Sequence, residues 1–138
     1  MKIFTDASAI LKKYVLEAGS EALDNLIEHT TDIAVSPTCL LEMHSALNRR
    51  VKEKTLLPGD VNFVVSEIKK DFKFFNIILW TQTLEDLGVK MIQKHGLRSL
   101  DAVVLSAGKL ANTDLFVTSD KGLYQAARKE LKEVRLIV

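Results

Sequence analysis

The sequence predicts an α/β fold of three layers, in which helices cover both faces of a central parallel sheet of about five strands. Two observations support this prediction. Short runs of β-branched and aromatic residues alternate with longer segments whose apolar residues recur at helical spacing. Several of the short runs are apolar throughout, as expected for strands that are covered on both faces. Strands joined by helices in this way form a parallel sheet with right-handed crossovers.

The first quarter of the chain predicts two strands separated by helices. Residues 2–5 (KIFT) and 32–35 (DIAV) are short apolar runs and form the first and second strands. Helical patterns cover about 7–15 and 20–29 between them.

Two helices are predicted between the second and third strands. The first covers 36–54, with Ser36 as its N-cap and Pro37 in the first turn, where a missing amide hydrogen is tolerated. Residues 58–60 (PGD) predict a turn in which Asp60 caps the next helix. The apolar stripe of that helix has helical spacing: Val61, Val64, Val65, Ile68 and Phe72.

The second half of the chain predicts three more strands. They are 76–80 (NIILW), 114–118 (DLFVT) and 134–138 (VRLIV). Two helices lie between the first two of these strands, and Ser99 is expected to cap the second one. Their apolar positions are Leu84, Leu87, Met91 and Ile92, then Leu100, Val103, Ala107 and Leu110. Asp120 opens the last helix, which carries Leu123, Ala126 and Ala127.

Size and composition fit one domain, residues 1–138, because a chain of 138 residues buries roughly two-thirds of its unfolded surface. Nineteen basic and 18 acidic residues give a net charge of +1, which neither requires nor excludes a nucleic-acid partner. Cys39 is the only cysteine, so no internal disulfide and no cysteine metal cluster can form. No stretch approaches the ~20 apolar residues of a membrane span, so we expect a soluble, cytoplasmic protein with no membrane partner.

Four carboxylates fall close to the predicted junctions between strands and helices. Asp6 and Asp120 follow the first and fourth strands. Glu42 lies about one and a half turns into the helix after the second strand, and Asp101 lies in the first turn of the helix that precedes the fourth strand. Because the strands of a parallel sheet end at one edge, all four can gather at that edge. Open α/β sheets bind their ligands there, near the point where the strand order reverses.

Each acid taken alone has a simpler explanation. Asp6 and Asp120 could be N-caps only, and Asp101 could only complement the helix dipole. Glu42 is harder to explain, because it lies in a segment expected to pack against the sheet and no basic residue precedes it within a turn. The set of four is therefore more specific than any one member.

A cluster of three or four carboxylates requires a cation. Two carboxylates ~5 Å apart repel by roughly 3 kcal/mol at an effective dielectric constant of about 20. The cluster must therefore hold a proton or bind a metal, and all-oxygen ligands suit Mg²⁺ or Mn²⁺ rather than Zn²⁺. Such a site can activate water and stabilise a phosphorane-like transition state, so hydrolysis of a phosphodiester is the predicted reaction.

Four segments, in chain order, resemble the motifs of PIN-domain ribonucleases. They are FTDASAIL (4–11), PTCLLEMHSAL (37–47), LRSLDAVVLSAG (97–108) and FVTSDKGLYQAA (116–127). The third is the most specific, because it is close to the helix start that the family shares. The resemblance extends over essentially the whole chain and implies a PIN-like fold. Short single-domain members of this size are commonly toxins of VapBC-type toxin–antitoxin pairs.

The resemblance also implies roles for individual residues. Ser8 and Thr118 would supply hydroxyls that orient the acids or water, and Ser119 is assigned no role. The family cleaves single-stranded RNA with Mg²⁺ or Mn²⁺, and its toxin members dimerise and bind a small antitoxin. A free PIN nuclease of RNA processing, or a non-catalytic PIN-like binding module, stays open as an alternative. The implied catalytic and metal-binding acids are Asp6, Glu42, Asp101 and Asp120.

Basic residues suggest weaker contacts with substrate. Arg98, three residues before Asp101, is the better candidate for a phosphate contact, and Lys121 is a weaker one. The helix over 36–54 ends in a basic cluster that is either solvated or in contact with RNA: Arg49, Arg50, Lys52 and Lys54.

The remaining candidates are interpreted as structural. His29 and His95 are expected at helix ends and His44 on a helix surface, and their spacing does not fit a shared metal. Phe74 and Phe75 are candidates for an exposed apolar contact with a partner.

Three rival enzyme classes lack their required residues. A haloacid-dehalogenase-type phosphatase needs a second Asp at the position of Ser8. A response-regulator receiver needs an Asp at the end of the third strand, which here ends in Trp80–Thr81. No glycine-rich phosphate loop with a lysine occurs, which argues against a P-loop NTPase.

Overall fold

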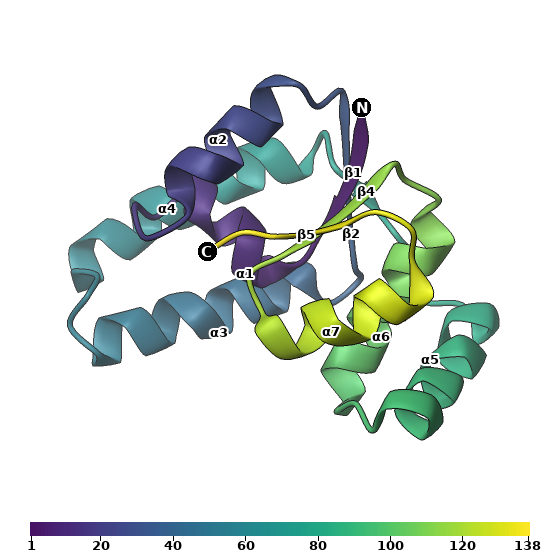
Figure 1. Ribbon diagram of the computed structural model, residues 1–138. Coiled ribbons are helices and arrows are strands. Elements are labelled where there is room, and N and C mark those ends of the chain that lie inside the picture. The colour runs from purple at the N-terminus through teal and green to yellow at the C-terminus, as the bar shows by residue number, and fades with distance from the viewer.

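The structure, a computed structural model that describes residues 1–138, confirms the three-layer α/β fold (Figure 1). One parallel sheet has the strand order β3-β2-β1-β4-β5. Its strands are β1 (Lys2–Thr5), β2 (Asp32–Val35), β3 (Asn76–Ile77), β4 (Leu115–Thr118) and β5 (Val134–Leu136). The helices are α1 (Ala7–Ile10), α2 (Ser20–Glu28), α3 (Cys39–Lys52), α4 (Pro58–Phe72), α5 (Gln82–His95), α6 (Ser99–Ala111) and α7 (Lys121–Glu130).

The two faces of the sheet are covered by different halves of the chain. Phe4 of β1 and Phe116 of β4 stand opposite each other in register, with ring centroids 5.2 Å apart, and pack under α5, α6 and α7. Ile3 and Val117 point the other way and pack against residues of α1 and α2. This alternation follows from the period of two along a strand. In Figure 1 helices α1 to α4 lie to the left of the sheet, and α5 to α7 lie below and to its right.

The strands match the predictions with one clear exception. Strands β1 and β2 have the predicted bounds, whereas the predicted strand over 76–80 is paired only at Asn76–Ile77. The amide of Ile78 still donates to the carbonyl of Val35 at 2.9 Å, but Leu79 and Trp80 are 73% and 54% exposed. This strand lies at the edge of the sheet, and its partner β2 ends at Val35, so the pairing stops there.

Three predicted helix starts are wrong. Ser36 is not an N-cap: it is buried, its hydroxyl lies 3.2 Å from that of Thr38, and Thr38 takes the N-cap position. Residues 58–60 are the first turn of α4 rather than a separate turn, so Asp60 lies inside the helix. Ser99 is the first helical residue of α6 and Arg98 takes its N-cap position.

Two helices differ from their predicted patterns. The segment predicted as a helix over 7–15 is α1 followed by a short 3₁₀ turn, Leu11–Lys13. Half of the predicted apolar stripe of α6 is wrong, because Leu100 and Leu110 are 49% and 39% exposed, whereas Val103 and Ala107 do pack in the core. The buried positions are Ala102, Val104, Leu105, Ser106, Ala107 and Gly108. Helix α6 lies between the sheet and α5, so its buried surface is wider than one stripe.

The positions of the three histidines and of Phe74 agree with the sequence interpretation, whereas that of Phe75 does not. His44 is exposed on α3, His95 is the last residue of α5, and His29 caps the C-terminus of α2. Phe74 is 86% exposed, whereas Phe75 packs against Phe72 with ring centroids 5.1 Å apart. None of the helices is both long enough and apolar enough to cross a membrane.

Candidate active site

Asp6 lies at the carboxyl end of β1, where the chain turns into α1. Its backbone amide continues the pairing with β4 by donating to the carbonyl of Val117 at 3.1 Å. Its side chain caps α1, because Oδ1 accepts from the amide of Ala9 at 2.9 Å. The residue is only 5% exposed. The capping interpretation is therefore right for Asp6, but one carboxylate oxygen is left for other partners.

Hydroxyl groups bind the second oxygen of Asp6. Thr118, at the end of β4, donates to Oδ2 at 2.5 Å, and its Oγ1 accepts from the backbone amide of Asp120 at 3.0 Å. Ser8 donates to both carboxylate oxygens, at 2.8 and 2.9 Å, and accepts from the amide of Ser119 at 3.0 Å. Ser8 and Thr118 thus join the ends of β1 and β4 at the level of the acid.

These two strand ends mark the topological switch point of the sheet. The chain passes from β1 outward through β2 and β3 and then returns to the other side of β1 with β4. The crossover helices therefore diverge between β1 and β4, and ligands bind at such a point in open α/β sheets. Asp6, Thr118 and Asp120 lie there. Asp120 is exposed, and its Oδ1 accepts from the amide of Leu123 at 2.9 Å, which caps α7.

Glu42 approaches the same edge from α3. It is half-buried, and its Oε2 accepts from the hydroxyl of Thr38 at 2.9 Å. Sequence reasoning missed Thr38, although a threonine four residues before a glutamate at a helix start is a usable signal. Asp101 lies in the first turn of α6 and is also half-buried.

The pKa shifts of three of the acids indicate that the four influence one another electrostatically. Burial raises the pKa of Asp6 from 3.8 to about 6, and the charge of Asp120 adds to the increase. Burial raises the pKa of Glu42 from 4.5 to about 7, with further contributions from Asp6 and Asp101. Burial and the charge of Asp120 raise the pKa of Asp101, and Arg98 opposes them. Each acid is therefore linked electrostatically to at least one other.

The chain provides no direct counter-charge for this cluster. None of the four acids takes part in an ion pair, although the protein forms seven elsewhere. The side-chain oxygen of Ser119, beside Asp120, is buried without a hydrogen-bond partner. An uncompensated group of carboxylates with a spare polar atom fits a hard cation.

The fit is partial, since no three acidic or other ligating side chains close around a single point. Mg²⁺ commonly binds through one or two carboxylates and completes its shell with water and substrate phosphate oxygens. The residues present therefore suit an ion that shares its ligands with water and a phosphate, and they do not form a closed protein cage.

The predicted phosphate contacts are less well supported. Arg98 is exposed and close enough to Asp101 to lower its pKa, so it borders the cluster. Lys121 is exposed and makes no side-chain hydrogen bond or ion pair, so only its position beside Asp120 connects it with the site. Arg50 is bound elsewhere, since its Nε and Nη2 donate to Glu17 at 2.9 Å each.

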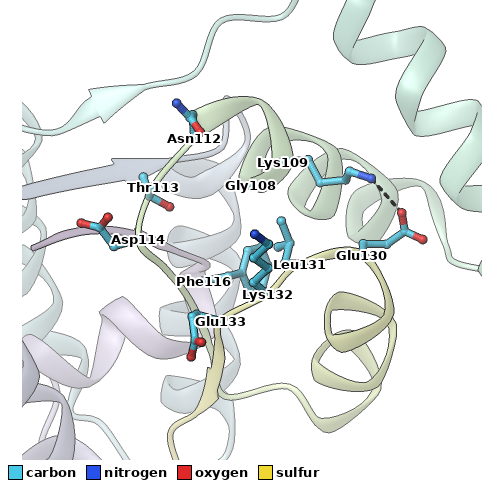
Figure 2. A pocket seen from close by; sticks show the side chains of 10 residues that line it. All are labelled: Gly108, Lys109, Asn112, Thr113, Asp114, Phe116, Glu130, Leu131, Lys132 and Glu133. Atoms are coloured by element: carbon cyan, nitrogen blue, oxygen red, sulfur yellow. Dashed lines mark hydrogen bonds and ion pairs between the residues drawn. The ribbon is translucent and has the colours of Figure 1, made fainter.

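A second charged cluster, which the sequence analysis did not detect, lies away from the acids. The carboxylate of Glu130 at the end of α7 is 2.8 Å from Lys94, His95 and Lys109, and its side chain is 5% exposed. Figure 2 shows the Lys109–Glu130 pair beside a hollow of about 330 Å³ at the end of the sheet where β4 and β5 begin. No local sequence signal links these residues, because they come from three different helices.

Comparison with known proteins matches a PIN domain family model to residues 3–129. The fold is similar to that of PAE2754 from Pyrobaculum aerophilum, with a TM-score of 0.70 and 19% identity over 99% of this chain and 92% of that one. No significant match occurs among curated protein sequences.

Two further similar structures come from assemblies. A toxin–antitoxin complex from Klebsiella pneumoniae gives a TM-score of 0.67 at 14% identity, over 99% of this chain and 98% of that one. VapBC2 from Rickettsia felis, bound to a DNA fragment from its promoter, gives a TM-score of 0.65 at 14% identity over the same shares. At these identities the likeness shows the fold alone.

Proposed function

Because the chain belongs to the PIN-domain family, we propose that it is an endoribonuclease that cleaves single-stranded RNA with the help of Mg²⁺ or Mn²⁺. PIN domains are generally nucleases, and such enzymes generally use divalent metal ions. What we propose beyond this is the identity of the substrate, the identity of the ion and the residues that bind each of them.

One observation supports the proposal more than any other. Four carboxylates from separate segments influence one another near the switch point of the sheet and form no ion pair, and burial raises the pKa of three of them: Asp6, Glu42 and Asp101. If these acids served only as helix caps, the absence of ion pairs would lower stability with no benefit, because a buried charge without an opposite charge is costly.

Each residue has a specific part in this mechanism. Asp6, held by Thr118 and Ser8, presents a fixed carboxylate, and Glu42 is oriented by Thr38. Asp101 and Asp120 add negative charge at the rim, and one or two of the four acids would bind the ion, with water and substrate phosphate oxygens completing its shell. A divalent ion held there would supply positive charge for activating water and for offsetting the charge that develops on the scissile phosphate. Arg98 would bind a phosphate oxygen of the strand.

The test is cleavage of single-stranded RNA with Mn²⁺ by the wild-type protein and by the variants Asp6→Asn and Asp101→Asn. We expect a loss of at least about 100-fold in rate, because an electrostatic contribution of this kind is typically worth 10²–10³. Circular dichroism would confirm that both variants are folded. Cleavage at the wild-type rate by folded variants would remove the mechanism.

We also propose that the protein is the toxin of a VapBC-type toxin–antitoxin pair, acting in the cytoplasm as a homodimer. The support is the resemblance of its motifs to short PIN toxins and a fold similar to that in a toxin–antitoxin complex from Klebsiella pneumoniae and in VapBC2 from Rickettsia felis. Expression should then arrest growth, and expression of the Asp101→Asn variant should not. Growth at the normal rate would favour a free PIN nuclease of RNA processing or decay.

A non-catalytic PIN-like module is the remaining alternative. It would typically lack at least one of the acids, and all four are present. Binding of RNA without cleavage in Mg²⁺ and in Mn²⁺ would favour this alternative over the nuclease.

A further inference from the structure

A hollow of about 370 Å³ lies beside Glu42, between α3 and α6. Its lining residues are Leu41, Glu42, Ser45, Arg49 and Leu100. It is therefore continuous with the acid cluster, since Glu42 belongs to both. Its volume is within the range of sites that hold a small ligand.

One face of α3 forms a row along this hollow. Glu42, Ser45 and Arg49 are three and then four residues apart, which places them on the same side of a helix. At a rise of about 1.5 Å per residue, Arg49 lies roughly 10 Å from Glu42 along the helix axis. The row thus begins with an acid of the site and ends with a guanidinium group.

Arg49 is the basic residue of α3 that is free to bind a ligand at this hollow. It is exposed and makes no side-chain hydrogen bond or ion pair. Its neighbour Arg50 is already bound to Glu17 through two nitrogens and to the carbonyl of Ala46. Lys52 and Lys54 do not line the hollow.

The walls of the hollow are apolar and exposed. Leu41 on α3 is 73% exposed and Leu100 on α6 is 49% exposed, although both lie next to an acid of the cluster. Exposed leucines beside charged groups offer a surface for a flat, partly apolar group such as a nucleobase. An anionic strand also needs positive charge beside four carboxylates, and Arg49 supplies it on the α3 side.

We propose that this hollow binds the nucleotide next to the scissile bond of a single-stranded RNA. Arg49 binds the phosphate of that nucleotide, and Leu41 and Leu100 pack against its base. The inference rests on the proposed function, since it assigns a subsite to the same substrate. Arg49 is a substrate-binding residue, and it does not act on the reacting atoms.

The experiment compares Arg49→Gln with Lys52→Gln, which removes the same charge from the same helix outside the hollow. Binding of a fluorescein-labelled single-stranded RNA is measured by anisotropy at several salt concentrations, and KM and kcat are measured with Mn²⁺. We expect Arg49→Gln to raise Kd and KM by about 5- to 10-fold and to reduce the salt slope of log Kd by about 0.7, as for the loss of one phosphate contact. Lys52→Gln should change Kd less than about 2-fold.

The apolar walls are tested separately with Leu41→Ser, an exposed position whose substitution should not affect folding. We expect Kd to rise about 3-fold with an unchanged salt slope, because stacking and apolar packing against a base involve no charged group. An unchanged Kd would overturn the base contact.

The outcomes separate this inference from the proposed function. If the wild type cleaves RNA while Arg49→Gln and Lys52→Gln have equal KM values and salt slopes, the subsite is wrong and the nuclease stands. If RNA binds with the expected dependence on Arg49 but is not cut, the subsite is supported and the nuclease is overturned. If no RNA binds, both fail.

Discussion

Asp6 is buried, and hydroxyl and amide donors alone surround its carboxylate. Thr118 is the most informative of these, because it donates to Oδ2 of Asp6 and accepts from the amide of Asp120. The hydroxyl of Thr118 thus forms hydrogen bonds both with the acid that follows β1 and with the backbone that follows β4. Without it, a buried acceptor and a backbone donor would each lose a partner.

Replacing Thr118 by valine tests this arrangement. The shape is nearly conserved but the hydroxyl is lost, so we expect the free energy of unfolding to fall by about 1–3 kcal/mol. Urea denaturation monitored by circular dichroism measures it. Thr55→Val is the control, because the hydroxyl of Thr55 is exposed and bonds only to the carbonyl of Arg50, and its effect should stay within about 0.5 kcal/mol. Equal losses in the two variants would mean that Thr118 has no special role.

Replacing Glu42 is expected to stabilise the metal-free protein, in contrast to replacing Thr118. Its pKa is raised to about 7, so at pH 8 the folded protein keeps a charge that its surroundings disfavour. Glu42→Gln keeps the shape and removes the charge. Because the group is only half-buried, we expect the metal-free variant to be more stable at pH 8 by about 1 kcal/mol, shown as a higher Tm.

Asp24→Asn, at an exposed acid of α2, should leave the Tm unchanged in the same experiment. A clear decrease for Glu42→Gln without metal would instead show that the carboxylate stabilises the fold through Thr38.

The positions of Asp6 and Asp120 at strand ends could be predicted from the residues alone, whereas their hydroxyl partners Ser8 and Thr118 were implied only by the family resemblance. Asp6 and Asp120 directly follow runs that must be strands, so their common edge followed from topology alone. The bond between Ser8 and Ser119 joins residues 111 positions apart, and nothing in either segment specifies the other. Such pairings depend on the strand order, which the sequence analysis did not predict.

At the scale of elements, Glu130 joins three helices. Its carboxylate at the end of α7 binds Lys94 and His95 of α5 and Lys109 of α6. Hydrogen bonds from Lys109 and Lys94 are the main cause of a pKa of about 2, well below the ordinary 4.5. This contribution to stability is therefore present above about pH 4.5 and is lost as the pH falls toward 2. The cluster holds α5 and α6, and with them Asp101, against the rest of the fold.

Glu130→Gln should lower the free energy of unfolding at pH 7 by about 1.5–3 kcal/mol, because the buried carboxylate of Glu130 loses its charge-assisted hydrogen bonds from Lys94 and Lys109. The control is Glu67→Gln, which removes the exposed pair with Lys70 and should cost less than about 0.5 kcal/mol. Denaturant titrations at pH 7 compare the two. Similar small losses would mean that the cluster contributes little to holding the helices.

Substitution of glycine by alanine is expected to change the stability in opposite directions at Gly108 and at Gly59. A Cβ at Gly108 of α6 would lie 2.4 Å from the ring of Phe116, whereas a Cβ at Gly59 of α4 would meet nothing within 4 Å. We expect Gly108→Ala to destabilise by about 1–3 kcal/mol through overpacking, and Gly59→Ala to stabilise by about 0.4–1 kcal/mol. Thermal unfolding of both variants measures the contrast, and a stable Gly108→Ala variant would mean that α6 can shift away from β4.

The errors in element boundaries have a common cause. Ser36, Asp60 and Ser99 were predicted as caps because their residue types favour N-caps, yet Thr38, Leu57 and Arg98 occupy those positions without a side-chain cap bond. Tertiary packing, not local capping, sets where these helices begin. Strand β3 was predicted too long for a related reason, because its apolar run continues beyond the end of its only partner.

At the scale of the whole molecule, charge is distributed unevenly. The four acids near the ends of β1 and β4 form no ion pair, whereas Glu130 forms ion pairs with Lys94 and Lys109 near the start of β5. The near-zero net charge conceals this separation, so composition alone could not reveal it. The alternation of strands and helices did predict a parallel sheet, and the edge at which parallel strands end was enough to locate the cluster.

The cluster should control how the stability of the metal-free protein depends on pH. The pKa of Asp6 rises from 3.8 to about 6 and that of Glu42 from 4.5 to about 7 on folding. A group whose pKa is raised in the folded state stabilises the fold below its unfolded pKa, and that stability is lost as the pH rises through the folded value. The stability contributed by Asp6 and Glu42 is therefore lost between about pH 4 and about pH 7, above the range in which Glu130 titrates.

We accordingly expect the Tm in a chelator to fall between pH 5 and pH 8. Millimolar Mn²⁺ should restore it at pH 8 and have little effect at pH 5, because an ion binds the ionised carboxylates and stabilises the folded state by mass action. Scanning fluorimetry across this range measures both effects. The variant Glu42→Gln should flatten the pH profile, because it removes one of the two shifted groups. A Tm that stays level or rises with pH, with no response to Mn²⁺, would mean that the carboxylates neither repel one another nor bind an ion.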